Sequence, residues 1–326
     1  MTVRAFWRAT KVETAQSPLD TIHLKIFYPA QMSDDQLSRN MGVVPANSQL
    51  APFPVVIFFN GFNCDAQIYQ WLAVELANRG LVVILFNWVA ENLPGFIGLT
   101  PGVDLSCLSP SSYGKSPSAL VLPALLEELE ELQNSGILTG MLDLDNIILG
   151  GHSAGGRIAL ENANPNFFPQ VKASFAYAAH SAAGTSMGYA AETILPLPDS
   201  LPMLIMGGTC DGVIANSAHR YEMSPDATLA IKRTFLEAIS GERNDSYLVL
   251  LQGANHFSMA TPIDSTTGRA FLDFPCTQSE TAIHALIAEI IGLFLDAHIR
   301  SSRSAYHALE KLFNDDNVLI ESCLRK

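Results

Sequence analysis

Residues 146–160 of this chain read NIILGGHSAGGRIAL, and this stretch decides the fold. It begins with an apolar run typical of a buried strand, and apolar residues return at helical spacing after the glycines. Between the two lies GHSAG, residues 151–155, a G-x-S-x-G pattern. A turn tight enough to raise a serine hydroxyl above the sheet leaves no room for side chains two positions before or after the serine. The stretch therefore predicts a strand, a sharp elbow and a helix, with Ser153 as nucleophile; an ordinary glycine-rich turn is the alternative.

Two further residues are candidates for activating Ser153, because a serine hydroxyl needs a base to take its proton. Around such an elbow the acid and the histidine follow the serine in chain order, each just past a strand. Asp211 follows the apolar run MLIMGG, and His256 follows LVLLQGAN. Histidine suits general-base work near neutral pH, and a carboxylate orients it. We expect these three residues to be catalytic. The alternatives are an ordinary turn aspartate before Gly212 and an ordinary loop histidine.

Ester or amide chemistry on a serine also needs N–H donors for the negative oxygen that develops on the substrate carbonyl. One donor should be the N–H of Ala154, directly after the nucleophile at the start of the helix. The other should come from the turn at residues 60–63 (NGFN), which follows an early apolar strand. We choose Phe62 as this second donor of the oxyanion hole. A simple Asn-Gly turn is the alternative.

Strands and helices alternate along the rest of the chain. Apolar runs typical of strands occur at residues 22–28, 54–59, 81–86, 146–149, 173–179, 203–206 and 247–251. Helical spacing occurs at residues 66–79, 117–134, 228–239 and 281–298, besides the helix that follows the elbow. This alternation predicts a single α/β domain over residues 1–326, with a mostly parallel sheet flanked by helices. Residues 301–326 are expected to add a C-terminal helical extension.

Residues 88–118 lack a clear period and are rich in Gly, Pro and Ser, yet they carry apolar and aromatic side chains. Long aperiodic segments in compact domains are usually functional. We expect a lid or a wall of the substrate pocket here, with packing under a long loop as the alternative. The residues expected to contact substrate are Phe62, Trp88, Phe96, Ile97 and His180.

Composition argues against several classes of partner. The formal net charge of −13 argues against nucleic acid and against electrostatic docking on an anionic membrane. The apolar stretch at residues 283–299 contains charged side chains and is expected to be a buried helix. The 5 cysteines have no metal-binding spacing, and no dinucleotide-binding glycine motif follows a strand, so we expect neither metal nor cofactor. Residues 1–16 do not suit a signal peptide, so the expected location is the cytoplasm.

Three segments together resemble chlorophyllases, a family of α/β-hydrolases. Residues 54–87 (PVVIFFNGFNCDAQIYQWLAVELANRGLVVILFN) resemble the family's oxyanion strand and first helix. Residues 151–156 (GHSAGG) are similar to the family's GHSRGG motif. Residues 253–259 (GANHFSM) and 266–274 (TTGRAFLDF) resemble bacterial members and their dienelactone-hydrolase-like and polyester-hydrolase-like relatives. The resemblance covers about residues 22–298.

Two positions depart from the family pattern. Ala154 stands where plant members usually have Arg, and Asn60 stands where the oxyanion turn usually begins with His. Neither departure affects the three expected catalytic residues.

The resemblance implies an α/β-hydrolase fold and hydrolysis of the phytyl ester of chlorophyll to chlorophyllide and phytol, with no cofactor. The implied partner is a hydrophobic small-molecule ester, and transient contact with a photosynthetic membrane surface would fit it. The alternatives are a general carboxylesterase or lipase, a polyester or lactone hydrolase that uses the same three residues, and a catalytically idle binding protein.

Overall fold

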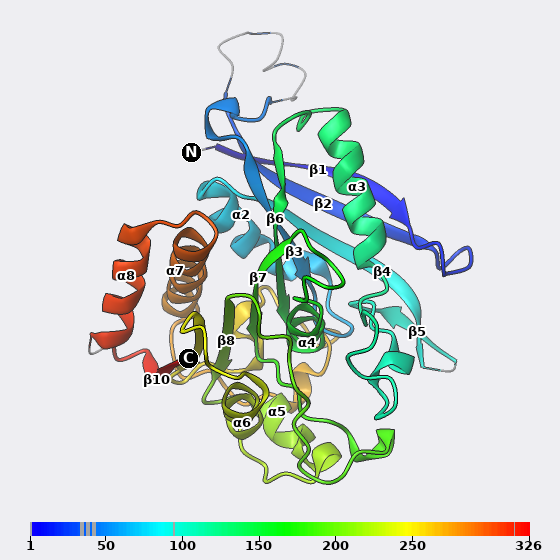
Figure 1. Cartoon of the computed structure of the whole chain (residues 1–326), viewed down its shortest axis with the longest axis vertical. Helices are drawn as coiled ribbons and strands as arrows, with labels where there is room; N and C mark the ends of the chain where they lie inside the picture. The colour runs from blue at the N-terminus through cyan, green and yellow to red at the C-terminus, as the bar shows by residue number, and fades with distance from the viewer. Residues whose placement is uncertain (1, 33–35, 37–39, 41–43, 94, 316) are drawn as a thin grey trace.

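A long twisted sheet with helices on both faces forms the centre of the molecule (Figure 1). The computed structural model describes residues 2–326 except 33–35, 37–39, 41–43, 94 and 316. Position 94, within the predicted insert, therefore lies outside the described residues. The strands are β1 (Thr2–Lys11), β2 (Thr21–Ala30), β3 (Phe53–Phe59), β4 (Val82–Leu93), β5 (Phe96–Leu99), β6 (Leu142–His152), β7 (Val171–Tyr177), β8 (Met203–Gly208), β9 (Ser246–Leu251) and β10 (Ile320–Arg325).

The described strands follow the order β1-β2-β4-β3-β6-β7-β8-β9-β10, and β5 pairs with β4. The block from β4 to β9 is parallel, whereas β2 and β10 run antiparallel to its two outer strands. The predicted α/β class with a mostly parallel sheet is thus confirmed. Parallel strands bring their carboxyl ends to one edge, and the strand order reverses beside β3. Ligands of open α/β sheets bind at such a switch point.

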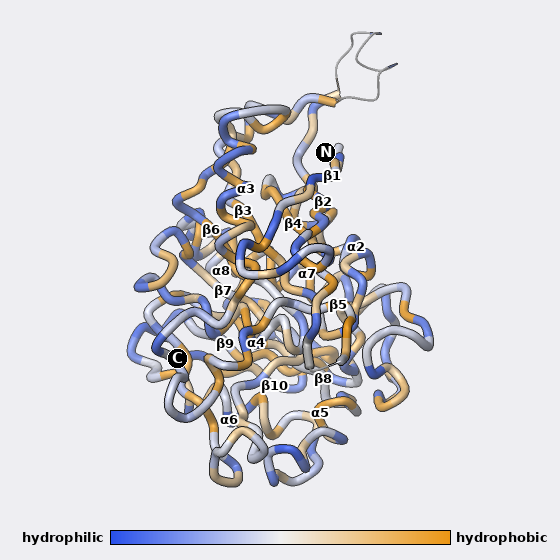
Figure 2. The backbone as a smooth tube through the Cα atoms, turned by 90° about the vertical axis from the view of Figure 1, so that its right-hand side faces the viewer, coloured by the Kyte–Doolittle hydropathy of each residue, from blue (hydrophilic) through white to orange (hydrophobic). Residues whose placement is uncertain are grey.

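Helices cover both faces because alternate residues of the buried strands point to opposite sides. Val55 and Ile57 of β3 pack in the cluster that contains α3, whereas Val56 and Phe58 pack with α2 and α7. Apolar residues accordingly concentrate along the central strands in Figure 2. The helices are α2 (Gln70–Asn78), α3 (Leu122–Asn134), α4 (Ser153–Glu161), α5 (Gly212–Ser217), α6 (Leu229–Ala238), α7 (Glu280–His298) and α8 (Arg303–Asn314).

The most apolar helix, α7, belongs to the core. Among the described residues it is the one helix long and apolar enough to cross a membrane. Its side chains Ile287, Ile290 and Phe294 are fully buried in the cluster that also contains α2. This packing confirms the prediction of a buried helix.

Two segments differ from the sequence-based prediction. Strand β4 continues to Leu93 and pairs antiparallel with β5, so the first part of the predicted insert is a β-hairpin rather than an aperiodic loop. At the C-terminus, α8 is followed by β10, which pairs with β9. The predicted helical extension therefore ends in a strand. Its residues are only partly buried, so β10 lacks the apolar run that identified the central strands.

The C-terminal strand holds together several elements. It covers the outer side of β9, whose residues are all buried. Arg325 forms an ion pair with Glu310 of α8 at 2.9 Å. The ammonium group of Lys326 donates to three carbonyls at the end of α6, those of Phe235, Leu236 and Ile239. A lysine at a helix C-terminus satisfies carbonyls that have no partner within the helix.

Deleting residues 319–326 should therefore destabilise the whole domain. We expect the melting temperature to fall by at least about 5 °C, which corresponds to a loss of about 2 kcal/mol. Thermal unfolding followed by circular dichroism measures this change. The control is Val318→Ser, because this side chain is 85% exposed beside the tail and should leave the melting temperature unchanged. A deletion variant that melts with the wild type would contradict the prediction.

Candidate active site

The predicted elbow is a sharp turn in which α4 begins at Ser153, directly after β6. Ser153 has φ of 54°, a left-handed conformation that side chains other than glycine rarely adopt. A Cβ at Gly155 would lie 2.3 Å from the carbonyl oxygens of both Phe59 and Asn60, and a Cβ at Gly151 would lie 2.5 Å from the carbonyl oxygen of Gly155. Gly151 thus allows the tight turn into α4, and Gly155 allows α4 to pack against the end of β3, which holds Ser153 at the carboxyl edge of the sheet.

Asp211 and His256 come from the ends of β8 and β9 and form a buried hydrogen bond. Asp211 Oδ2 lies 2.8 Å from His256 Nδ1, and both side chains are at least 95% buried. Asp211 Oδ1 caps α5 by accepting the N–H of Ile214 at 2.8 Å. Because a carboxylate only accepts hydrogen bonds, His256 carries its proton on Nδ1, which leaves Nε2 free to act as a base.

His152, which precedes the nucleophile, connects three loops of the site. Its Nε2–H donates to the carbonyl oxygen of His256 at 2.9 Å, and its Nδ1 accepts from the hydroxyl of Tyr69 at 2.8 Å. The Tyr69 oxygen in turn accepts the N–H of Gly61 at 3.1 Å. Burial, and then the charge of nearby His256, hold the pKa of His152 well below its ordinary value. A neutral His152 therefore ties the elbow to the histidine loop and to the 60–63 turn.

Of the two expected oxyanion donors, Ala154 lies in the elbow as the second residue of α4, and Phe62 lies on the 60–63 turn. Within the described part of the chain, the N–H groups of Phe62 and Ala154 donate to no carbonyl. The neighbours of Phe62 are bonded, since Gly61 N–H binds Tyr69 and Asn63 N–H donates to the Leu99 carbonyl at 3.0 Å. The turn therefore leaves the Phe62 N–H available.

Phe62 forms an apolar rim together with the β4–β5 hairpin. Its ring stacks on Phe96 of β5, with centroids 6.3 Å apart and planes 19° apart. Phe62 is 38% exposed, Phe96 49% and Ile97 58%. Exposed aromatic and aliphatic side chains in contact mark a surface suited to an apolar ligand. Two of the five residues predicted to contact substrate, Phe62 and Phe96, therefore stack on each other in the rim, and a third, Ile97, is the exposed neighbour of Phe96 on β5.

A second set of exposed apolar side chains, missed from the sequence and counted here with the rim, lies on the loop at residues 263–274. The N–H of Gly268 donates to the carbonyl of Asn63 at 3.0 Å, which holds this loop against the 60–63 turn. Its exposed apolar side chains are Ile263, Phe271 and Phe274. The sequence signal for these side chains was a group of apolar residues between His256 and α7, in a segment without helical or strand periodicity.

Trp88 and His180 are placed differently from the rim residues. Trp88 is 4% exposed in the core, and its indole N–H donates to the Leu19 carbonyl at 2.8 Å. Strand β4 thus carries Trp88 into the core rather than the rim, and its contact with substrate stays a prediction. His180 packs edge-on against Tyr221, and burial together with the charges of Arg157 and His256 lowers its pKa to about 3. His180 is thus a neutral, mostly packed side chain near the site.

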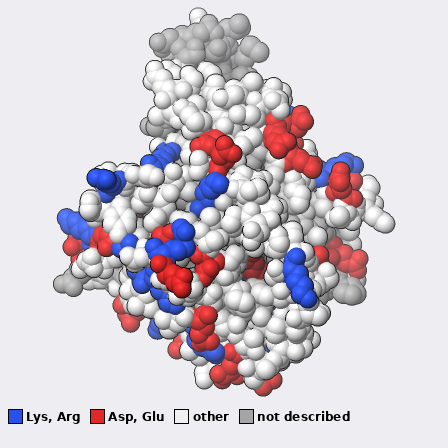
Figure 3. Space-filling view, in the orientation of Figure 1, with Lys and Arg blue, Asp and Glu red and all other residues white. Residues whose placement is uncertain are grey.

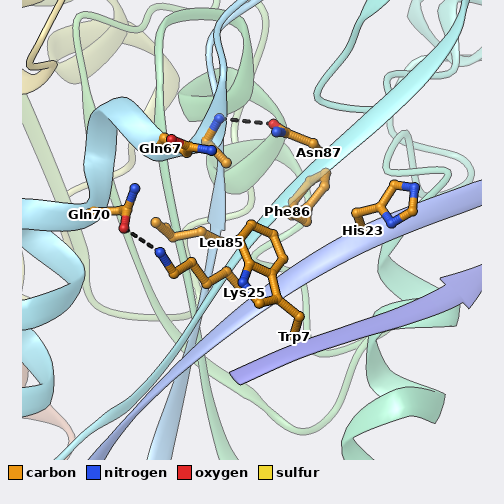
Figure 4. A pocket seen from close by; sticks show the side chains of 9 residues that line it. Trp7, His23, Lys25, Gln67, Gln70, Leu85, Phe86 and Asn87 are labelled. Atoms are coloured by element: carbon orange, nitrogen blue, oxygen red, sulfur yellow. Dashed lines mark hydrogen bonds between the residues drawn. The ribbon is translucent and has the colours of Figure 1, made fainter. Parts of the chain in front are cut away.

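Two cavities lie away from these residues. One of about 10 Å³ lies beside β1, β2 and β4 and is drawn in Figure 4, where Lys25 points toward Trp7 and Gln70. It has room for about one water molecule. A larger cavity of about 230 Å³ lies between the predicted insert and the end of α4, and is lined by Tyr113, Glu161 and Phe167 among others. Neither cavity is lined by Ser153, Asp211 or His256.

The grouping of charged side chains bears on metal and nucleic-acid binding. Among the residues that the structure describes, no group of three His, Cys, Asp or Glu side chains could hold a metal ion. On the face in Figure 3, lysines and arginines are scattered among acidic side chains rather than gathered into a basic patch.

The parallel sheet, the elbow after β6 and the acid and histidine after β8 and β9 define the α/β-hydrolase fold. Comparison with solved structures agrees. The chain is similar to a ferulic acid esterase from Streptomyces cinnamoneus, with a TM-score of 0.61 and 15% sequence identity over 99% of this chain and 96% of that one. No protein-family model matches the chain, and no curated protein matches it. At this identity the similarity establishes the fold.

The left-handed backbone at position 153 leads to a stability prediction. Ser153→Gly should be more stable than Ser153→Ala by about 1 kcal/mol, or about 2–4 °C in melting temperature, because only glycine adopts positive φ without strain. Thermal unfolding of the two variants measures the difference. The matched pair is Ser186→Gly and Ser186→Ala, at an exposed serine outside the positive-φ positions, where alanine should be the more stable. The same order at both positions would contradict strain at Ser153.

Proposed function

We propose that this protein is a serine carboxylic-ester hydrolase. The observation that supports the proposal most is the buried 2.8 Å hydrogen bond between Asp211 and His256, two residues that follow Ser153 in the order expected for this fold. The strained serine and the free N–H groups of Phe62 and Ala154 add support. A binding protein without catalysis would have no need of a strained serine or of a histidine oriented by a buried carboxylate.

The reaction proceeds in two halves. The Ser153 hydroxyl oxygen attacks the ester carbonyl carbon while His256 Nε2 takes its proton, and the N–H groups of Phe62 and Ala154 bind the resulting oxyanion. As the intermediate collapses, the bond to the alcohol oxygen breaks and His256 protonates that oxygen. Water then attacks the acyl-enzyme, losing its proton to His256, and releases the acid. His256 returns this proton to Ser153, and Asp211 stabilises the charged imidazole in each half.

Apolar rim residues suggest the class of ester. Phe62, Phe96, Ile97, Ile263, Phe271 and Phe274 are all exposed. An ester with a bulky apolar or aromatic part would cover them, whereas a small polar ester would not. A general carboxylesterase with this preference is the function best supported. The resemblance to chlorophyllases makes the phytyl ester of chlorophyll a finer candidate, and the structural similarity to a ferulic acid esterase makes an ester of an aromatic acid another.

The test is hydrolysis of a p-nitrophenyl ester, methyl ferulate and chlorophyll a by wild type, Ser153→Ala and the matched control Ser186→Ala. We expect wild type and Ser186→Ala to hydrolyse at least one ester, and Ser153→Ala to lose more than about 1,000-fold in kcat.

The substrate that is cleaved then decides the finer function. Chlorophyllide formation would support chlorophyllase activity, and cleavage of methyl ferulate would support an aromatic-acid esterase. Cleavage of the p-nitrophenyl ester alone would leave a general carboxylesterase. A wild type that cleaves none of the three, or a fully active Ser153→Ala, would contradict the proposal.

A further inference from the structure

Asp273 is a second carboxylate beside the Asp211–His256 pair, and it lies in the loop that carries part of the rim. Its Oδ1 accepts the N–H of Gly212 at 2.9 Å and the N–H of His256 at 3.2 Å. Its Oδ2 accepts the N–H of Phe257 at 3.1 Å. One side chain thus contacts the backbone directly after the triad acid and the backbone of the triad histidine itself.

These N–H groups lie at the starts of helical turns, where the helix itself supplies no acceptor. Gly212 is the first residue of α5, and His256 and Phe257 are the first two of a 3-10 turn, His256–Met259. The first N–H groups of a helix have no partner within it. Asp211 takes one of them, that of Ile214, with its own carboxylate. Asp273 accepts those of Gly212, His256 and Phe257 from outside and so joins the starts of both turns.

Glycine at position 212 is required for this arrangement. A Cβ there would lie 2.4 Å from the backbone nitrogen of Phe274 and 2.5 Å from the carbonyl oxygen of Leu272. The 263–274 loop therefore packs directly on the turn that carries Asp211. The contact brings Asp273 against the backbone of the two turns that carry Asp211 and His256.

We infer that Asp273 is a positioning residue, which fixes the Asp211 and His256 turns relative to each other and adds a negative charge beside the imidazole. The inference rests on the proposed function. Asp273 itself touches neither substrate nor the reacting atoms.

Electrostatics around the carboxylate agree with this geometry. Burial and the charge of Asp211 raise the pKa of Asp273, while the charge of His256 and the N–H groups of Gly212 and Phe257 oppose that rise. The ionisable groups that face the His256 ring are Asp211, Asp273, His152 and His180. Burial lowers the pKa of both other histidines, and so does the charge of His256 and, at His180, the charge of Arg157. The two carboxylates are therefore the charges available to stabilise an imidazolium. Placing two carboxylates close together costs stability, which an active site can justify.

Asp273→Asn tests the inference, because it removes the charge and offers an N–H₂ group where Phe257 needs an acceptor. We expect kcat for a p-nitrophenyl ester to fall about 10- to 100-fold with KM within about twofold, the effect of a misplaced base. The matched control is Asp226→Asn, another aspartate that accepts two backbone N–H groups at a helix start but lies away from the site. It should keep wild-type kcat. A kcat within about twofold of wild type for Asp273→Asn, or an equal loss in Asp226→Asn, would overturn the inference.

Crystal structures of wild type and Asp273→Asn give a readout that does not depend on activity. We expect the Asp211 Oδ2 to His256 Nδ1 distance to lengthen beyond hydrogen-bonding range in the variant. An unchanged distance would show that Asp273 does not position the pair, even if kcat falls. If wild type hydrolyses no ester, the proposed function fails, but this distance still decides whether Asp273 positions His256.

Discussion

The close packing of α4 against the end of β3 is the constraint on which the rest of the site depends. The backbone carbonyl oxygens of Phe59 and Asn60 occupy the space that a side chain at position 155 would need. With glycine there, the helix can start directly after β6, and the backbone of Ser153 is forced to φ of 54°. The same contact brings the start of the 60–63 turn beside α4. Among the described residues the N–H groups of Phe62 and Ala154 donate to no carbonyl, and their role as oxyanion donors stays a prediction.

Loops beyond the elbow are joined by buried polar groups rather than by the sheet. His152 links the histidine loop to the 60–63 turn through Tyr69. Asp273 links the histidine turn to the start of α5 on the opposite side. His152, Tyr69 and Asp273 each have hydrogen-bond partners, and a polar network orders a site where its members are paired. The buried Oδ1 of Asn60, in the 60–63 turn, has no partner among the described residues. The His256 turn is therefore held from two directions, and its ring is fixed by Asp211.

Sequence patterns were informative where structure follows from neighbours in the chain. Local apolar runs predict the elbow and place Asp211 and His256 just past strands. The structure joins Asp211 and His256 by a hydrogen bond. Their catalytic roles stay predictions. Sequence patterns failed where packing between distant segments determines the position of a residue. Trp88 looked like part of an aperiodic insert, yet pairing of β2 with β4 carries it into the core. Strand β10 has no apolar run, and Asp273 gains its contacts only when its loop folds onto Gly212.

The most direct test of an activated serine at the elbow is labelling with a fluorophosphonate, followed by peptide mapping by mass spectrometry. A hydroxyl reacts with this reagent only when a neighbouring base takes its proton. The expected result is one adduct, on Ser153, that forms in the wild type and not in His256→Ala. An unlabelled wild type, an adduct on another residue, or equal labelling without His256 would contradict the account.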